Sequence, residues 1–212
     1  MALKVEDVDF AQSANTFLAV FLGAFLATIG GLAAGQAEAF FHRRAKERGA
    51  ALLFGEVLTT LQTLLRLAAE TRAIGDPYGP ITMRMLRAAR REIEVYDRNR
   101  ETLYELRDGP LRVKLHTLVL RINMPLESLL DVHTEISELR TALKVPGLNA
   151  ADRMEIEEAL ATRLERRDTG FDFLVEIAPE IGEICAELGH IAKHRFARYQ
   201  GNAVGVVPRA SE

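Results

Sequence analysis

The longest apolar stretch of the sequence lies near its N-terminus. Residues 10–37 contain no Asp, Glu, Lys or Arg over 28 positions, and residues 17–34 are almost all Leu, Phe, Ala, Val, Ile or Gly. A helix rises about 1.5 Å per residue, so about 20 such residues cross a hydrocarbon core of about 30 Å. We therefore predict a transmembrane helix within residues 14–41, preceded by a short non-cytoplasmic leader, residues 1–13.

Two other structures would contain such a stretch. A cleaved signal peptide has a basic leader and an apolar segment of only about 7–15 residues, whereas residues 1–9 hold one Lys and three acids. Cleavage near Ala37 is nevertheless an alternative. A helix buried in a soluble core is another, but Phe and Leu on every side would need a larger protein around them.

Basic residues follow the apolar run at once, at Arg43, Arg44, Lys46 and Arg48, while the leader has Lys4 alone. Cytoplasmic flanks collect Lys and Arg. This asymmetry predicts a protein of the bacterial inner membrane with its N-terminus outside and its C-terminal domain in the cytoplasm. The four cations that follow the helix would also attract lipid head groups, for about 1 kcal/mol each.

Small residues recur at every fourth position of the apolar run, at Ala19, Gly23, Ala27, Gly31 and Gly35. They share one side of a helix and let another backbone come close. The spacing predicts a homo-oligomer, or pairing with another membrane-protein subunit.

The rest of the chain is helical in pattern. Turn residues separate its apolar repeats at 75–80, 108–110 and 145–149, and no segment alternates for long enough to be a strand. We expect an all-α fold: the transmembrane helix, then a cytoplasmic antiparallel helical bundle over residues 42–199, with long, partly coiled-coil-like helices. Residues 200–212 lack periodicity and are expected to be a flexible tail.

Apolar residues at spacings of three and four predict the buried face of each long helix. On the first helix these are Leu53, Val57, Leu61, Leu64 and Ala68. The region 81–107 is expected to form two short helices. On the third helix the face is a seven-residue repeat from Leu111 to Leu143 with Pro125 at one position, and on the last it is Leu174, Ile177, Ile181, Ile184, Leu188 and Ile191.

One set of residues on the last helix suggests metal chemistry. Glu187 and His190 have the Glu-x-x-His spacing of di-iron bundles, and His194 is one turn further on. The chain has no second Glu-x-x-His, so an acidic stripe facing solvent or a partner is the simpler interpretation. The single cysteine, Cys185, falls on the apolar side and is expected to be a small buried hydrophobe.

Charge and the absence of motifs exclude several functions. The formal net charge is -3, and acids interleave with the arginines of residues 84–100, so nucleic-acid binding is not expected. The sequence contains no phosphate-binding glycine loop, nucleophile elbow or paired-cysteine motif. We therefore predict that the protein is not an enzyme and needs no cofactor.

Two segments, residues 51–61 (ALLFGEVLTTL) and 95–106 (VYDRNRETLYEL), resemble a group of uncharacterised bacterial proteins that have one N-terminal membrane helix and a cytoplasmic helical domain. The resemblance implies this architecture and no activity. The favoured hypothesis is a membrane-anchored scaffold or accessory subunit that acts by protein–protein interaction. The alternatives are a membrane-anchored sensor or effector that passes a signal along the first helix, and a metal-binding helical enzyme.

Overall fold

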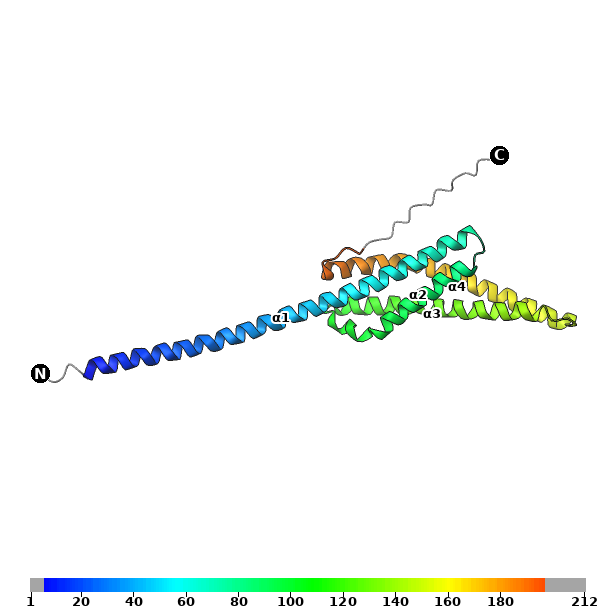
Figure 1. The fold of residues 1–212 in the computed structure, drawn as a ribbon. Helices are drawn as coiled ribbons and strands as arrows, with labels where there is room; N and C mark the ends of the chain where they lie inside the picture. Colours follow the sequence, from blue (N-terminus) through cyan, green and yellow to red (C-terminus); the bar gives the residue numbers. More distant parts are fainter. Residues whose placement is uncertain (1–5, 197–212) are drawn as a thin grey trace, which may run out of the picture. The chain divides into compact units, whose positions relative to one another are not determined.

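The computed structural model describes the backbone of residues 6–196 and the side chains of residues 20–196. Four α-helices and one 3-10 helix follow one another: α1 (Glu6–Ile74), α2 (Pro80–Arg98), η1 (Arg100–Glu105), α3 (Gly109–Ala142) and α4 (Ala150–Ala192) (Figure 1). No strand occurs within this described part of the chain. The all-α prediction is therefore confirmed, and α1 continues past the apolar run as far as Ile74. The tail predicted for residues 200–212 lies outside the described residues.

The chain divides into two units between Lys46 and Glu47. The first unit is the N-terminal part of α1, and its large apolar side chains are exposed on every side of the helix: Val20, Phe21, Leu22, Phe25, Leu26, Ile29, Leu32, Phe40 and Phe41. By length and composition this helix is able to cross a membrane, and no residue of its most apolar stretch is buried. One candidate transmembrane helix is thus present among the residues described.

The second unit begins at Glu47 and has a single hydrophobic core. The rest of α1, together with α2, η1, α3 and α4, contributes buried side chains to that core. Phe54 of α1 packs against Tyr96 of α2 with ring centroids 5.6 Å apart, and Tyr78 meets Phe171 of α4 edge to face at 5.9 Å. Burial of this apolar area is the main stabilising term of such a domain.

Local signals set the starts of α3 and α4. The Asp108 carboxylate accepts a hydrogen bond from Leu111 N at 3.0 Å. In the same way Asn149 Oδ1 accepts from Asp152 N at 2.8 Å, so Asn149 is the N-cap of α4. Each cap satisfies a backbone N–H that has no partner within its own helix.

The buried faces differ in detail from those predicted. On α1 the fully buried positions include Phe54 and Leu65, while the predicted Leu53 and Leu64 are half-buried beside them. The difference arises because residues 51–54 are all apolar, so spacing alone cannot fix which side of the helix is buried. On α3 the chain continues through Pro125, and Leu126 takes the buried position.

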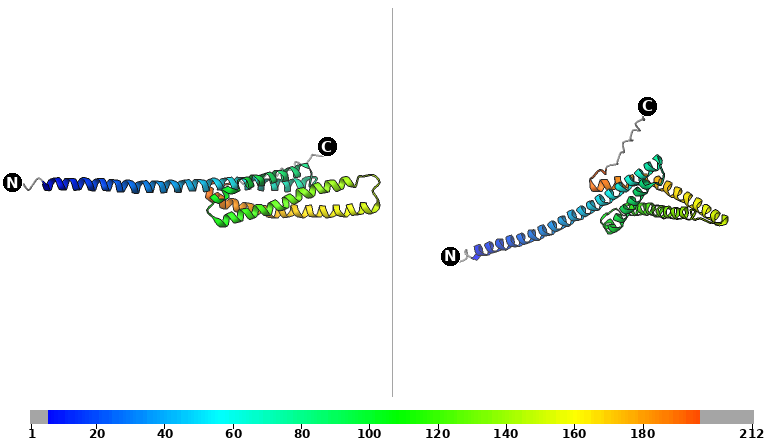
Figure 2. Two further views of the ribbon diagram at one scale, coloured as in Figure 1. Left: turned by 90° about the horizontal axis from the view of Figure 1, so that it is seen from below. Right: turned by 45° about the vertical axis from the view of Figure 1, so that its right-hand side comes forward.

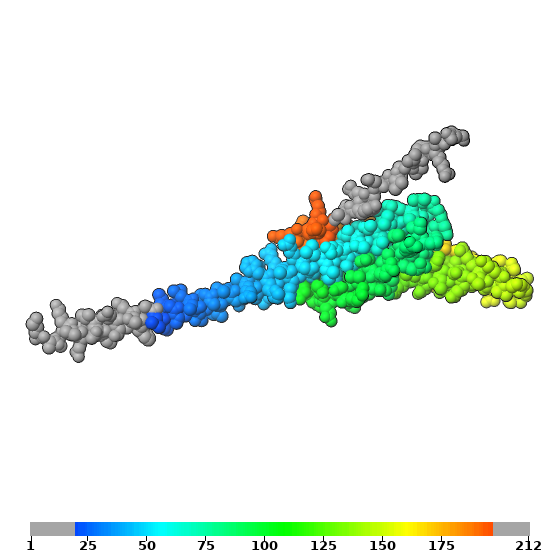
Figure 3. Space-filling view, in the orientation of Figure 1, coloured from blue at the N-terminus to red at the C-terminus, as the bar shows by residue number. Residues whose placement is uncertain are grey.

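Helices α3 and α4 lie side by side and run in opposite directions (Figure 2). Arg163 of α4 forms an ion pair with Glu135 of α3, and Arg166 donates to Ser128 Oγ at 3.1 Å. The part of this pair nearest the connecting turn projects beyond the remainder of the second unit (yellow in Figure 3).

Candidate functional site

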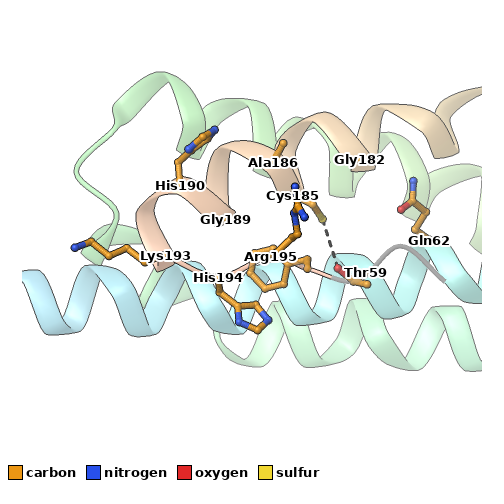
Figure 4. A pocket seen from close by; sticks show the side chains of 11 residues that line it. Thr59, Gln62, Gly182, Cys185, Ala186, Gly189, His190, Lys193, His194 and Arg195 are labelled. Atoms are coloured by element: carbon orange, nitrogen blue, oxygen red, sulfur yellow. Dashed lines mark hydrogen bonds between the residues drawn. The ribbon is translucent and has the colours of Figure 1, made fainter. Parts of the chain in front are cut away.

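A groove runs between α1 and α4 within the second unit. It consists of two adjoining cavities of about 570 and 920 Å³, and Gln62 of α1 and Gly182 of α4 line both of them. The smaller cavity extends to Ala69 and Val175, and the larger one to Phe196. Figure 4 shows the larger cavity, with Gln62 rising from one helix opposite Gly182 on the other. The groove is therefore continuous along both helices.

Small residues on α4 leave this space open. They recur at spacings of four, four and three, at Ala178, Gly182, Ala186 and Gly189, and residues at such spacings share one side of a helix. The lining also includes polar residues, among them Thr59, Gln62 and His190, and a concave surface of this kind is typical of a binding site.

Polar contacts beside the groove join its two walls. Gln62 Nε2 donates to the carbonyl oxygen of Ala178 at 3.1 Å, and Cys185 Sγ lies 3.7 Å from Thr59 Oγ1. Cys185 is buried, as predicted. These contacts hold α1 and α4 together, so the groove exists before anything binds in it.

Residues 193–196, which directly follow α4, line one end of the groove. The helix ends at Ala192, and Lys193 adopts a left-handed conformation with φ of 50°. The chain then turns back, since His194 N donates to Gly189 O at 3.1 Å. The ring of Phe196 follows, so close to Gly55 of α1 that a Cβ on that glycine would overlap it.

This ending separates the three candidate metal residues, Glu187, His190 and His194. Glu187 and His190 lie on α4, but His194 is beyond its end and does not continue the helical face. Glu187 instead pairs with Lys114 of α3 at 2.9 Å, and this hydrogen bond raises the pKa of Lys114. Among the described residues no three His, Cys, Asp or Glu side chains come together as metal ligands would.

Part of the acidic stripe of α4 pairs with cations of α3. Glu180 forms an ion pair with Arg121 of α3 at 2.6 Å, as Glu187 does with Lys114. Glu176 and Glu183 are exposed. Half of these four carboxylates therefore bind the neighbouring helix, and the stripe is not wholly available to solvent or a partner.

The small-residue stripe of α1 faces open space. A Cβ added at Gly23, Gly31 or Gly35 would meet no other atom within 4 Å, and Ala27 is exposed. The side chain of Ala19 lies outside the described residues. No described residue of this chain therefore covers the stripe.

The predicted head-group cations fall on both sides of the unit boundary. Arg43, Arg44 and Lys46 belong to the first unit, where Arg44 lies 5.9 Å from the ring of Phe40. Arg48 belongs to the second, and its Nε donates to the carbonyl oxygen of Ala192 at 2.7 Å. Arg48 therefore caps the C-terminus of α4, where a cation is favourable.

Sequence reasoning missed a buried arginine. The side chain of Arg167 on α4 is only 10% exposed, and its guanidinium lies 3.5 Å from the ring centroid of Tyr78. Neither Arg167 Nε nor His133 Nδ1 of α3 has a hydrogen-bond partner among the described residues. The sequence offers no signal for this contact, because Arg167 is one of several charged residues in a polar run, residues 165–168.

Burial lowers the pKa of His133, and the nearby cations Arg167, Arg87 and Arg140 lower it further against a smaller opposing effect of Asp76. The unfolded chain therefore binds this proton at a higher pH than the folded one, so the free energy of unfolding should fall as the pH falls below about 6.5.

We expect His133→Gln to lose less stability than the wild type between about pH 7.5 and 5.5. Urea unfolding followed by circular dichroism across this range measures the difference. The exposed His190 provides the control, since His190→Gln should keep the wild-type pH dependence. Equal slopes for His133→Gln and the wild type would contradict the prediction.

No protein-family model matches the chain, and neither a curated protein nor a solved structure matches it. The class that the structure itself defines is an all-helical protein with one candidate transmembrane helix among the described residues. The resemblance of residues 51–61 and 95–106 to membrane-anchored helical-domain proteins stays a prediction.

Proposed function

We propose that the protein is a membrane-anchored helical scaffold or accessory subunit of a bacterial inner-membrane complex, and that it acts by protein–protein interaction. The observation that carries the proposal is the fully exposed apolar part of α1. Leaving so many Phe and Leu side chains in water is unfavourable, whereas a hydrocarbon core accommodates all of them.

Charge supports one orientation in that membrane. Arg43 and Arg44 follow the apolar residues directly, and Lys4 is the only cation before them. By the preference of cytoplasmic flanks for Lys and Arg, the helical bundle that begins near residue 42 faces the cytoplasm. The same flank would contact lipid head groups.

The mechanism we propose is helix association through the small-residue stripe of Ala19, Gly23, Ala27, Gly31 and Gly35. Apolar helices gain little from hydrophobic burial against each other within lipid, so close backbone packing matters more. The open space next to Gly31 and Gly35 is what such packing requires. The partner would be a second copy or another membrane subunit.

Replacing Gly31 and Gly35 with isoleucine should abolish this association. The test is affinity purification of tagged full-length protein from detergent-solubilised membranes that also contain an untagged copy. The wild type should bring down a second copy or another subunit in fixed ratio, and the double variant should not. Gly30→Ile is the matched control, because Gly30 lies off the stripe and next to equally open space.

A wild type that purifies alone would contradict the scaffold proposal. It would favour the second candidate, a self-contained sensor. One observation supports that candidate: the first residues of the second unit hold two other elements. Glu47 accepts from Arg107 N at 3.1 Å, just before α3, and Arg48 binds the end of α4. A rotation of α1 at this point would therefore act on both α3 and α4.

A further inference from the structure

Two chain segments meet the first residues of the second unit. Glu47 accepts a hydrogen bond from Arg107 N at 3.1 Å, and Arg48 Nε donates to the carbonyl oxygen of Ala192 at 2.7 Å. The turn between η1 and α3 and the end of α4 therefore lie at the same end of the second unit, opposite the tip of the α3–α4 hairpin (Figures 1 and 2). We define this basal end as residues 47–48, 100–112 and 193–195.

The chain enters the second unit at the basal end. Phe41, the last residue of the predicted transmembrane helix, is six residues before Glu47, and six residues span about 20 Å at most, even when fully extended. The proposed function, on which this step rests, places residues 14–41 in a membrane. The basal end is then tethered close to the lipid head groups.

The basal end carries an excess of positive charge. Residues 100–112 and 193–195 contain five Lys and Arg and three Asp and Glu, whereas residues 144–158 at the hairpin tip contain two and four. Of the basal acids, Asp108 is engaged as the N-cap of α3. Lys193 and Arg195 are exposed, and no described residue forms an ion pair with either of them. These cations are therefore available to an anionic surface.

An exposed aromatic side chain lies among these cations. Tyr104 of η1 is 78% exposed, and the guanidinium of Arg112 lies 5.9 Å from the centroid of its ring. Tyrosine is enriched where a membrane meets water, because its ring is apolar and its hydroxyl is polar. The long stems of Lys and Arg let their charges reach the head groups at the same level. The combination therefore matches the surface of an anionic membrane.

We propose that the basal end of the second unit is a membrane-contact surface that binds anionic phospholipid head groups. The ring of Tyr104 enters the interface, and Arg112, Lys193 and Arg195 bind the phosphates. This contact is a second attachment to the bilayer besides the apolar part of α1. It directs the acidic tip of the α3–α4 hairpin away from the membrane, where a partner can reach it.

The chain suits a fluorescence test because it contains no tryptophan. Full-length protein with Tyr104→Trp is reconstituted into vesicles of phosphatidylglycerol and phosphatidylcholine, part of the latter carrying a spin label on its head group. The label quenches an indole that touches the interface. We expect quenching several-fold stronger than for Met154→Trp, because Met154 is 69% exposed but belongs to the hairpin tip.

Charge reversal distinguishes binding from the effect of the tether alone. Adding Arg112→Glu and Lys193→Glu to Tyr104→Trp should reduce the quenching to nearly that of Met154→Trp. Vesicles of phosphatidylcholine alone should do the same, as should salt at about 1 M, where the screening length is about 3 Å. Lys144→Glu and Arg153→Glu reverse two exposed cations at the hairpin tip and should leave the quenching of Tyr104→Trp unchanged.

Failure of the basal contact can be told apart from failure of the anchor. If the protein survives a carbonate wash of the vesicles but both indoles are quenched equally, the basal contact is overturned and the anchor stands. Protein that the wash removes would overturn both. Strong quenching of Tyr104→Trp that charge reversal, lipid composition and salt do not change would also overturn the basal contact, because the tether alone would then hold the indole near the lipid.

Discussion

Replacing Phe25 and Leu26 with arginine is expected to prevent stable insertion of the protein into membranes. These side chains are 55% and 61% exposed and lie near the middle of the apolar part of α1. An arginine at the centre of a membrane helix costs about 2.5–3.5 kcal/mol. Two of them cost about 5–7 kcal/mol, or roughly four to five powers of ten in the insertion equilibrium.

Cell fractionation followed by an alkaline carbonate wash measures the effect. The wild type should stay in the washed membranes, and Phe25→Arg/Leu26→Arg should be released or should aggregate. The control has the same number of added arginines at the end of the helix, Phe40→Arg/Phe41→Arg, where long basic side chains reach the head groups. This control should remain inserted.

The outcome also tests the interpretation of the apolar part of α1. If the charged double variant remains as resistant to carbonate as the wild type, α1 does not cross the membrane, and the exposed apolar side chains must be covered by another protein. The scaffold proposal would then lose its anchor, although the second unit and its groove would be unaffected.

Sequence pattern predicted those parts of the fold that local chemistry controls. The turns predicted at 108–110 and 145–149 contain Asp108 and Asn149, whose side chains bond to backbone N–H groups three residues away, so residue type alone indicates where α3 and α4 begin. The apolar part of α1 was equally predictable from the sequence, because the composition of many consecutive residues indicates it.

Contacts between distant segments could not be predicted in this way. α4 ends at Ala192 because Lys193 takes a left-handed conformation and Phe196 packs on Gly55. A left-handed C-terminal residue is usually Gly or Asn, so a Lys there carries no signal. The groove could not be predicted either. It exists because small residues of α4 leave space beside α1, and such a space can be recognised only when the arrangement of both helices is known.

The buried face of α1 was only partly predictable from the sequence. Its apolar residues are so dense over residues 50–58 that two faces fit the three-and-four spacing. One face includes Leu53 and Leu64, and the structure selects the other, in which Phe54 and Leu65 are buried, while Val57 is buried and belongs to both. Packing against α2 decides the choice, because Phe54 meets the Tyr96 ring.

Tyr96 is itself held by a polar chain that links α2 to α3. Arg100 can only donate to Nε2 of His116, at 3.2 Å, so the neutral imidazole carries its proton on Nδ1 and donates to Tyr96 Oη at 3.0 Å. Burial raises the pKa of Tyr96 to about 12, so the phenol is neutral. His116 thus fixes the ring on which Phe54 packs.

Phe54→Ala should therefore be among the most damaging substitutions in the second unit. Phe54 is 0% exposed, and truncation of a buried phenylalanine costs about 3–5 kcal/mol from transfer and cavity terms together. A typical domain has only about 5–15 kcal/mol in all. We expect a much lower urea midpoint for the full-length protein in detergent, monitored by circular dichroism.

The neighbouring Leu53→Ala is the matched control and also decides which face of α1 is buried. Leu53 is half-buried at the edge of the core, so its truncation should cost about 1 kcal/mol, near the centre of the range for point substitutions. If Leu53→Ala lowers the midpoint as much as Phe54→Ala, the face predicted from spacing is the true core face. A far larger loss for Phe54→Ala would instead show that contact with Tyr96 across the α1–α2 interface sets the rotation of α1, and with it which α1 side chains line the groove.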